Sequence, residues 1–144
     1  MLWCEKIDPA VRRSSRGVSV EMTLVVADSS YIAEGILKNS SLFEGYVLCS
    51  PDYGLYEILN AVWKHEVLLK KVRESGPILD TLFDLVDAER IRFVTLTEET
   101  RKKAYKLAVK VKTPIYDTGF IVLARELGVE LKTLDAKQAK LALE

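Results

Sequence analysis

The apolar residues of this chain form short unbroken runs, separated by longer segments with helical periodicity. Residues 23–27 (TLVVA) and 46–49 (YVLC) are such runs, and residues 91–96 and 129–134 are two further strand candidates. Runs of this length are typical of strands that are buried on both faces of a sheet. The helical segments between them favour parallel strands joined by right-handed crossovers.

The segments between the runs carry apolar stripes at helical spacing, together with capping residues. Ser50 and Pro51 predict the start of one helix, because serine is a good N-cap and proline is accepted at the first helical position. Gly128 predicts the end of another. The helices that we expect cover residues 29–38, 51–72, 77–86, 98–112, 117–127 and 136 onward. The pattern predicts an α/β fold with three layers, α/β/α, around a mostly parallel sheet of four to five strands.

Residues 1–21 differ from the rest of the chain. They contain three arginines, have no clear period, and lack the apolar core of a signal peptide. We expect a poorly ordered leader, with Met22 as an alternative or true start, followed by a single domain over residues 22–144. No apolar stretch approaches the roughly 20 residues that cross a membrane, so we expect no membrane contact. With no secretory signal and few cysteines, we expect a cytoplasmic protein.

The composition is that of a globular domain without an overall charge bias. The chain has 144 residues, of which 49% are hydrophobic and 29% charged, and its formal net charge is +0. Contact with a polyanion therefore requires a local basic patch or a bound cation. One histidine and two cysteines without ligand spacing argue against structural zinc. The chain also has no glycine-rich phosphate loop of the G-x-x-x-x-G-K type, which excludes NTP hydrolysis by that route.

Four acidic residues lie far apart in the sequence but close to the ends of predicted strands. Asp28 follows the first strand, Asp135 follows the fourth, and Asp117 opens a helix. Glu57 lies about two turns inside its helix. Functional groups of open α/β sheets gather at the carboxyl ends of the strands, so we expect these acids to meet there. Such a carboxylate cluster is unfavourable unless a hard cation such as Mg²⁺ neutralises it.

Each acid also has a purely structural interpretation. Aspartate is among the best N-caps, which would explain Asp28, Asp117 and Asp135. Asp135 and Gln138 together resemble a capping box. Glu57 lies on the polar face of its helix and is explained equally well as a solvated side chain. Only a meeting of the four acids at one edge favours a functional site.

Polar residues near the acids are candidates for supporting roles. Ser30 lies two residues after the first acid, Asn60 lies one turn after the second, and Thr133 lies two residues before the last. Thr133 and the last acid point to the same face of their strand, because side chains alternate along a strand. A hydroxyl or amide at such a position orients a carboxylate or holds a water molecule.

The chain resembles the PIN-domain ribonucleases, and in particular the VapC-type toxins of toxin–antitoxin pairs, from about residue 23 to residue 141. The segments that carry the resemblance are VVADSSYIAEGIL, YEILNAVWK and YDTGFIVLARELGVELKTLDAKQAKLA. The last is the most specific, because it combines an acid, a helix, a glycine, a strand and a second acid at the spacing of the family.

The resemblance implies a PIN-like fold and a metal-dependent endoribonuclease activity. It implies that Mg²⁺ or Mn²⁺ is held by an acidic quartet, namely Asp28, Glu57, Asp117 and Asp135, with the hydroxyls of residues 30 and 133 in support. It further implies an RNA substrate, a cognate antitoxin that fills the acidic groove, and a homodimer. The chain departs from some relatives in lacking an acid in the final helix after Asp135. The sequence also stops soon after that helix, so a possible final strand beyond it is expected to be short or absent.

Two other functions stay open. A non-catalytic PIN-like module for RNA or protein binding would keep the fold without turnover, and a metal titration distinguishes it. A phosphoacceptor receiver domain also carries acids at strand ends. That class has paired acids after the first strand, whereas in this chain Asp28 is followed by two serines.

A basic segment over residues 101–112 (RKKAYKLAVKVK) also has two interpretations. Its arginine and lysines lie largely opposite its apolar stripe, and they either follow an RNA backbone or form a solvated helix face.

Overall fold

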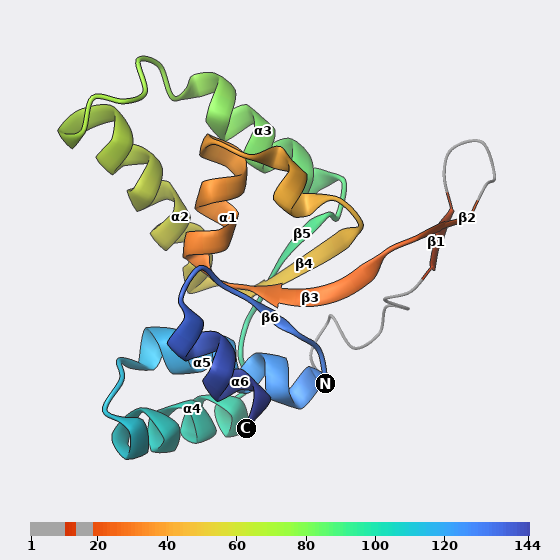
Figure 1. The fold of residues 1–144 in the computed structure, drawn as a ribbon, viewed down its shortest axis with the longest axis vertical. Helices are drawn as coiled ribbons and strands as arrows, with labels where there is room; N and C mark the ends of the chain where they lie inside the picture. The colour runs from red at the N-terminus through yellow and green to blue at the C-terminus, as the bar shows by residue number, and fades with distance from the viewer. Residues whose placement is uncertain (1–10, 14–18) are drawn as a thin grey trace.

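Four parallel strands form the central sheet of this computed structural model, which describes residues 11–13 and 19–144 (Figure 1). The strands are β3 (Thr23–Ala27), β4 (Tyr46–Pro51), β5 (Ile91–Val94) and β6 (Leu131–Lys132), in the order β5-β4-β3-β6. All three pairings are parallel, so each connection crosses over the sheet. The predicted α/β architecture with a parallel four-stranded sheet is confirmed.

Two short strands precede this sheet. β1 (Val11–Arg13) and β2 (Ser19–Glu21) pair antiparallel with each other. Most of the predicted leader, residues 1–10 and 14–18, lies outside the described residues. The domain boundary at Met22 therefore stays a prediction.

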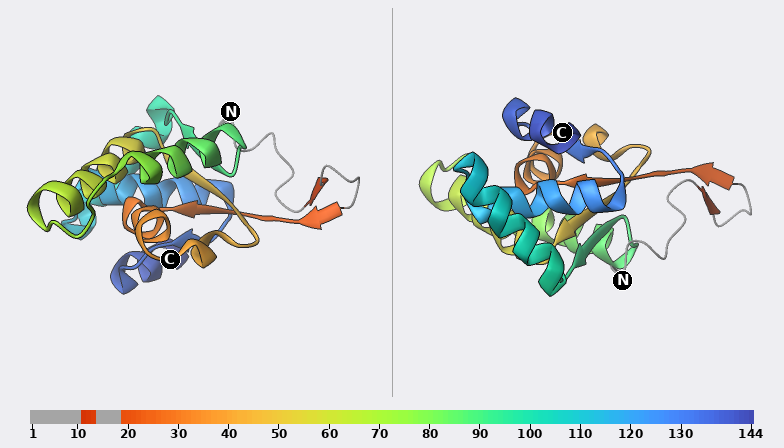
Figure 2. Two further views of the ribbon diagram at one scale, coloured as in Figure 1. Left: turned by 90° about the horizontal axis from the view of Figure 1, so that it is seen from above. Right: turned by 90° about the horizontal axis from the view of Figure 1, so that it is seen from below.

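Helices cover both faces of the sheet, as Figures 1 and 2 show. One face carries α1 (Ser29–Leu37), the 3₁₀ turn η2 (Ser40–Phe43), α2 (Tyr53–Trp63) and α3 (Gly76–Asp87). The other carries α4 (Glu98–Val111), α5 (Ile115–Leu127) and α6 (Ala136–Leu143). Along β3, Leu24 and Val26 enter the core beneath α5, whereas Val25 and Ala27 enter the core beneath α1. This alternation is the strand periodicity of a sheet buried on both sides.

The helix α5 is the most deeply buried of the helices. Every residue from Thr118 to Ala124 is buried. Its amino end lies next to α2, because the Tyr53 hydroxyl donates a 2.7 Å hydrogen bond to the carbonyl of Tyr116. The first turn of α5, which contains Asp117, is thereby fixed beside the sheet edge where β4 ends.

One predicted helix start is wrong. The strand β4 continues through Ser50 and Pro51, which pair with Phe93 and Val94 of β5, and α2 begins only at Tyr53. The same helix also ends earlier than expected, at Trp63, and continues as a π-turn, η3 (Lys64–Leu68), instead of reaching residue 72.

Other sequence signals for helix ends are confirmed. The Thr97 hydroxyl accepts the amide of Thr100 at 3.1 Å and caps α4, and Gly128 ends α5 with a left-handed φ of 67°. The predicted strand over residues 129–134 is shorter than expected, since β6 covers only Leu131–Lys132 and pairs with β3 at Val26 and Ala27. Among the described residues, no helix is both long enough and apolar enough to cross a membrane.

Candidate functional site at the carboxyl edge of the sheet

Asp28 is held rigidly where β3 ends. Its backbone amide donates a 3.0 Å hydrogen bond to the carbonyl of Lys132 in β6, and the residue is only 5% exposed. One carboxylate oxygen accepts the Tyr31 amide at 3.0 Å and the Ser30 hydroxyl at 2.7 Å. The other accepts the hydroxyl of Thr133. Asp28 thus caps α1, as the structural interpretation predicted, and Ser30 contacts it as expected of a supporting residue.

Thr133 joins two of the four acids. Its hydroxyl donates to Asp28 and also accepts the backbone amide of Asp135 at 3.0 Å. The Asp135 carboxylate in turn accepts the amides of Lys137 and Gln138, at 2.9 and 3.4 Å, and caps α6. Asp135 is exposed, so its carboxylate is open to solvent at the same edge of the sheet.

Glu57 turns inward from α2. It is half-buried, and its carboxylate accepts a 2.8 Å hydrogen bond from the hydroxyl of Ser29 in α1. Burial raises the pKa of Glu57, the Ser29 hydrogen bond lowers it, and the negative charges of Asp117 and Asp28 raise it further. Glu57 is therefore not a freely solvated side chain.

Asp117 lies in the first turn of α5 and is half-buried. The N-cap position of this helix belongs to Pro114, and no side chain caps it. Burial raises the pKa of Asp117, a hydrogen bond with Gln138 lowers it, and the charges of Asp28 and Asp135 raise it. Capping explains Asp28 and Asp135 but does not explain the position of Asp117 next to other acids.

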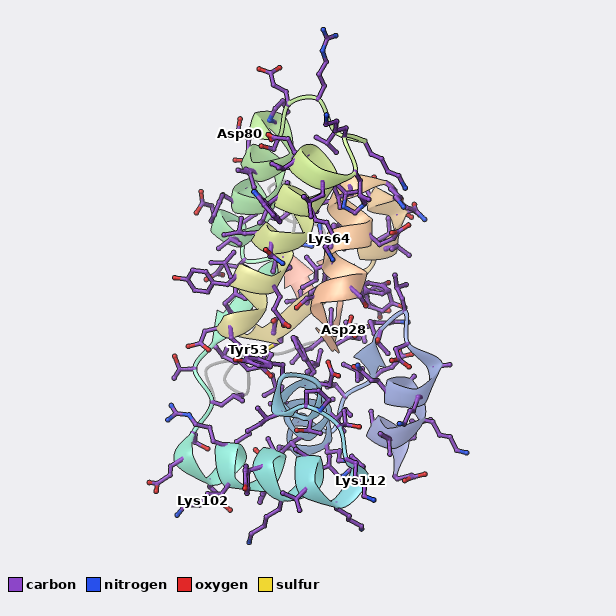
Figure 3. All side chains as sticks on the ribbon, turned by 90° about the vertical axis from the view of Figure 1, so that its left-hand side faces the viewer. Asp28, Tyr53, Lys64, Asp80, Lys102 and Lys112 are labelled. Carbon is purple, nitrogen blue, oxygen red and sulfur yellow. The ribbon has the colours of Figure 1, made fainter. Side chains whose placement is uncertain are left out.

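The four predicted acids lie close enough to influence one another. Asp28 lies between the α1–α3 half and the α4–α6 half of the molecule, with Tyr53 nearby (Figure 3). The charge of Asp28 acts on Glu57 and on Asp117, and Asp135 also acts on Asp117. Within residues 11–13 and 19–144, however, no three histidine, cysteine, aspartate or glutamate side chains are grouped so as to hold a metal ion as they stand. Sharing one ion therefore requires side-chain rotation or bridging waters, which Mg²⁺ commonly retains.

The donor set fits a hard divalent cation. All four side chains offer carboxylate oxygens, which suit Mg²⁺ or Mn²⁺. The side-chain oxygen of Gln138, next to Asp117, is buried and has no hydrogen-bond partner in the described part of the chain. Burial raises the pKa values of Glu57 and Asp117, and the charges of neighbouring acids raise them further. A cation at this edge would relieve that repulsion.

Asn60, the remaining predicted residue, lies beside this edge. Within the described residues it makes no hydrogen bond to Glu57, but both line an open groove of about 610 Å³. The groove is also lined by Ser30 and Ala33 of α1 and by Lys64, which Figure 3 shows farther along α2 from the site. Asn60 is thus placed near the acids without orienting one.

Three residues that contact or adjoin the candidate acids were not predicted to do so from the sequence. Ser29 binds Glu57, Gln138 binds Asp117, and Tyr53 stands between α2 and the start of α5. Burial and the charges of Glu57, Asp117 and Asp52 raise the pKa of Tyr53, which places its ring beside the acids. The two serines that follow Asp28 in the sequence were a signal for a supporting hydroxyl, but the sequence reasoning chose Ser30 and not Ser29.

Comparison with known proteins gives one informative similarity. The chain is 31% identical over 90 residues to Ribonuclease VapC3 of Pyrobaculum aerophilum, a match that covers 62% of this chain. The matched region covers 66% of the relative, just under two thirds of that protein's length. At this identity and coverage the similarity is distant. No protein-family model matches the chain.

Proposed function

We propose that this protein is a metal-dependent endoribonuclease that hydrolyses RNA phosphodiesters at a site formed by Asp28, Glu57, Asp117 and Asp135. The observation that carries the proposal is that acids distant in sequence meet at one edge of the sheet. Thr133 donates to the Asp28 carboxylate and accepts the Asp135 amide, and half-buried Asp117 lies within reach of both charges. The distant similarity to a protein named as a VapC ribonuclease supports the same reaction class.

In this proposal the acids have different roles. Asp28 is the most firmly fixed, since both of its carboxylate oxygens accept hydrogen bonds from neighbouring groups. Asp28 and Asp117 hold the cation directly, and Asp135, which is exposed, holds it directly or through water. The chemistry that a bound Mg²⁺ or Mn²⁺ supplies is polarisation of the phosphodiester and activation of water.

Glu57 is the best candidate to accept a proton. A general base works best when its pKa lies close to the working pH, and both burial and the neighbouring acids raise the pKa of Glu57. Ser29 fixes one of its oxygens at 2.8 Å and leaves the other for the attacking water. In the alternative division of roles, Glu57 holds a second cation instead.

The proposal includes protein partners. We propose that the chain is the toxin of a toxin–antitoxin pair and that a segment of the antitoxin fills the groove beside the acids. We also propose a homodimer that forms through exposed apolar helix faces. The outer face of α2 and the following π-turn supplies such a surface, with Tyr56 74%, Trp63 49% and Leu68 59% exposed. Apolar areas of this kind commonly mark protein interfaces.

The test is cleavage of a mixed RNA pool by the full chain in Mg²⁺, in Mn²⁺ and in EDTA. The variants Asp28→Asn and Asp117→Asn are expected to lose at least about 100-fold in cleavage rate, as expected when a charged group that acts on the reacting atoms is removed. Asp84→Asn is the matched control, because Asp84 is an exposed acid on α3, on the outer surface of the helical layer.

The outcomes separate the candidate functions. Cleavage that needs the metal and both acids supports the nuclease. Equal cleavage by wild type and by the two site variants contradicts it. RNA or antitoxin binding without turnover, in a protein that calorimetry shows to bind no Mg²⁺ or Mn²⁺, would establish the non-catalytic module instead.

A further inference from the structure

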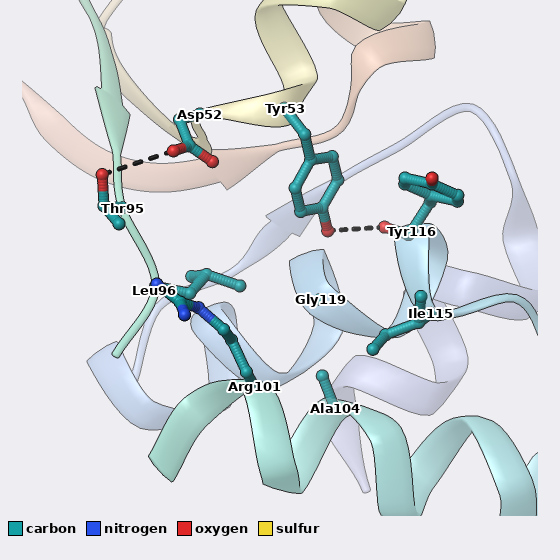
Figure 4. Close-up of a pocket in the computed structure, with 9 residues that line it drawn as sticks. All are labelled: Asp52, Tyr53, Thr95, Leu96, Arg101, Ala104, Ile115, Tyr116 and Gly119. Carbon is teal, nitrogen blue, oxygen red and sulfur yellow. Dashed lines mark hydrogen bonds between the residues drawn. The ribbon is translucent and has the colours of Figure 1, made fainter. Parts of the chain in front are cut away.

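A second pocket opens next to the acidic site, on the α4 side of α5. It has a volume of about 340 Å³, at the lower end of the range for small-ligand sites (Figure 4). Its floor is apolar, with Leu96 and Ala104, and its walls come from the start of α2, the loop after β5 and the first turns of α4 and α5. None of the acids of the proposed catalytic site lines it.

Two tyrosines form an aromatic wall of this pocket. Tyr53 and Tyr116 meet edge to face with 5.5 Å between ring centroids, and the Tyr53 hydroxyl donates to the Tyr116 carbonyl at 2.7 Å. Gly119 makes this arrangement possible, because a Cβ atom there would lie 2.0 Å from the Tyr53 hydroxyl oxygen. The Tyr53 ring is thereby fixed, while Tyr116 is 58% exposed and presents its ring to an incoming ligand.

The pocket also holds one cation and one anion that do not pair with each other. Arg101 reaches up from α4 and Asp52 lies at the start of α2 (Figure 4). Among the described residues Arg101 has no ion pair, whereas its neighbours Lys102 and Lys103 bind Glu98 and Glu99. The hydrogen bond recorded for the Asp52 side chain is one long contact, 3.3 Å, from the Thr95 hydroxyl. Both charged groups are therefore available to a ligand.

This combination matches the chemistry of an unpaired nucleobase. Proteins recognise single-stranded RNA by stacking bases on aromatic rings and by binding base edges with polar side chains. A guanidinium is the usual partner of the O6 and N7 acceptors of guanine. The N1 and N2 hydrogens of guanine, on another edge of the same base, are donors that a carboxylate such as that of Asp52 accepts. Guanine satisfies both charged groups, whereas adenine lacks the O6 acceptor and the N1 hydrogen.

The position of the pocket suits a nucleotide next to the reacting phosphate. Tyr116 immediately precedes Asp117, and the negative charges of both Asp117 and Glu57 act on Tyr53. The tyrosine pair thus has the acidic site on one side and the pocket on the other. An RNA strand whose phosphate lies at the acids can place an adjoining base against Tyr116.

We propose that this pocket binds an unpaired guanine of the RNA substrate, stacked on Tyr116 and read by Arg101 and Asp52. The inference rests on the proposed ribonuclease function, because it concerns the substrate of that site, but it makes a prediction about binding that does not need turnover.

The experiment measures fluorescence anisotropy of the full chain with labelled single-stranded oligoribonucleotides. The set contains a guanine-bearing 8-mer and versions of it with adenine or an abasic residue at each position. Binding is measured in EDTA and in Ca²⁺ to suppress cleavage. At one position, loss of the base is expected to weaken binding about 5- to 100-fold, the range for one stacked base. Replacement of guanine by adenine there is expected to weaken binding by at least about 5-fold.

Variants connect this position to the pocket. Tyr116→Leu is expected to weaken binding of the guanine-bearing 8-mer and to leave binding of the abasic one unchanged. Arg101→Gln is expected to weaken binding of the guanine-bearing 8-mer more than binding of the abasic one, because it removes the contact with the base as well as a positive charge. Both variants therefore reduce the difference between the two oligonucleotides. Asp52→Asn is expected to remove the preference for guanine over adenine. Lys110→Gln is the matched control, since Lys110 is an exposed cation on the same helix and should weaken all oligonucleotides equally. Thermal melting confirms that each variant is folded.

The results distinguish this inference from the proposed function. Base-dependent binding that the pocket variants abolish supports the subsite even when no RNA is cleaved in Mg²⁺, in which case only the nuclease proposal fails. Cleavage by a protein whose binding depends on no single base, or whose base dependence survives Arg101→Gln and Tyr116→Leu, overturns the subsite and leaves the nuclease. The subsite is also overturned if the wild type binds no oligonucleotide in either condition. It is likewise overturned if the pocket variants change only the binding of a partner protein and not the binding of RNA.

Discussion

Thr133 donates its hydroxyl hydrogen to the carboxylate of Asp28, a residue 105 positions earlier in the chain. The same hydroxyl oxygen accepts the backbone amide of Asp135 at 3.0 Å. One side chain at the end of β6 therefore holds an acid from the end of β3 and fixes the turn that carries a second acid. The pairing of β6 with β3 makes this contact possible, because it aligns Ala27 with Lys132 and sets the following residues side by side.

Replacing Thr133 with valine should therefore affect both stability and cleavage. Thr133→Val keeps the shape of the side chain but leaves the Asp28 carboxylate and the Asp135 amide without this partner. We expect a loss of about 1–3 kcal/mol in the free energy of unfolding, measured by urea denaturation. RNA cleavage should fall more than the folded fraction does. Thr133→Ser retains the hydroxyl and should restore most of both, and equal effects of serine and valine would contradict the role of the hydrogen bond.

Ser29 offers a test of Glu57 as the proton acceptor. Its 2.8 Å hydrogen bond lowers the pKa of Glu57, so Ser29→Ala should raise that pKa further. If Glu57 must be ionised for cleavage, the acid limb of the pH–rate profile moves to higher pH in this variant. The maximum rate at high pH should change much less. Ser29→Thr keeps the hydroxyl and is the control; a parallel drop at all pH values would show a structural effect alone.

The acids should make the metal-free protein less stable as pH rises. The pKa of Asp117 is raised in the folded state, by burial first and then by Asp28 and Asp135, so the folded state binds more protons than the unfolded state above about pH 4. Stability that is present below the unfolded pKa is then lost as pH passes through the raised folded pKa. We expect the urea midpoint in EDTA to decrease across this window.

The variant Asp117→Asn should show a smaller decrease, because it removes one of the interacting charges. Asp84→Asn changes an exposed acid, so the urea midpoint of this variant should depend on pH as it does in the wild type. Saturating Mg²⁺ should raise the midpoint of wild type at neutral pH, since binding to the folded state adds about 2.7 kcal/mol at 100 times the dissociation constant. Indistinguishable slopes for wild type and Asp117→Asn would mean that the pKa of Asp117 is not raised in the folded state.

Gly119→Ala tests the contact between α5 and Tyr53. The new methyl group would lie 2.0 Å from the Tyr53 hydroxyl oxygen and 3.1 Å from the ring carbon that bears it. We expect about 1–3 kcal/mol of destabilisation, even though alanine is the better helix former. In Tyr53→Phe the obstructing oxygen is absent, so the same substitution should be less harmful there. A double-mutant cycle by urea denaturation measures the difference, and strictly additive effects would exclude this contact as the cause.

Local signals in the sequence predicted much of the fold. The run TLVVA became β3, and the capping residues Thr97 and Gly128 mark helix ends where they were expected. Such signals succeed because they depend on neighbouring residues alone. The Ser50-Pro51 signal failed because β5 offered β4 further strand pairing, and a local preference for a helix start was outweighed by that nonlocal ladder.

The capping box predicted for Asp135 and Gln138 shows the same limit within the site. Asp135 does cap α6, but its own backbone amide is already bound by the hydroxyl of Thr133. The Gln138 side chain is therefore not needed there and bonds to Asp117 of another helix. A four-residue motif predicts which groups lie close together along a helix, but it does not predict which competing partner comes from elsewhere in the fold.

The strand runs, the parallel α/β class and the four candidate acids could be predicted from the chain alone, because periodicity and position after a strand are properties of the sequence. The tertiary structure alone decided that Glu57 turns inward to Ser29, that Asp117 is half-buried beside Asp28, and that Tyr53 and Arg101 border one pocket. These features depend on burial and on charges brought together from different elements. Such interactions form only after the helices have packed around the edge of the sheet.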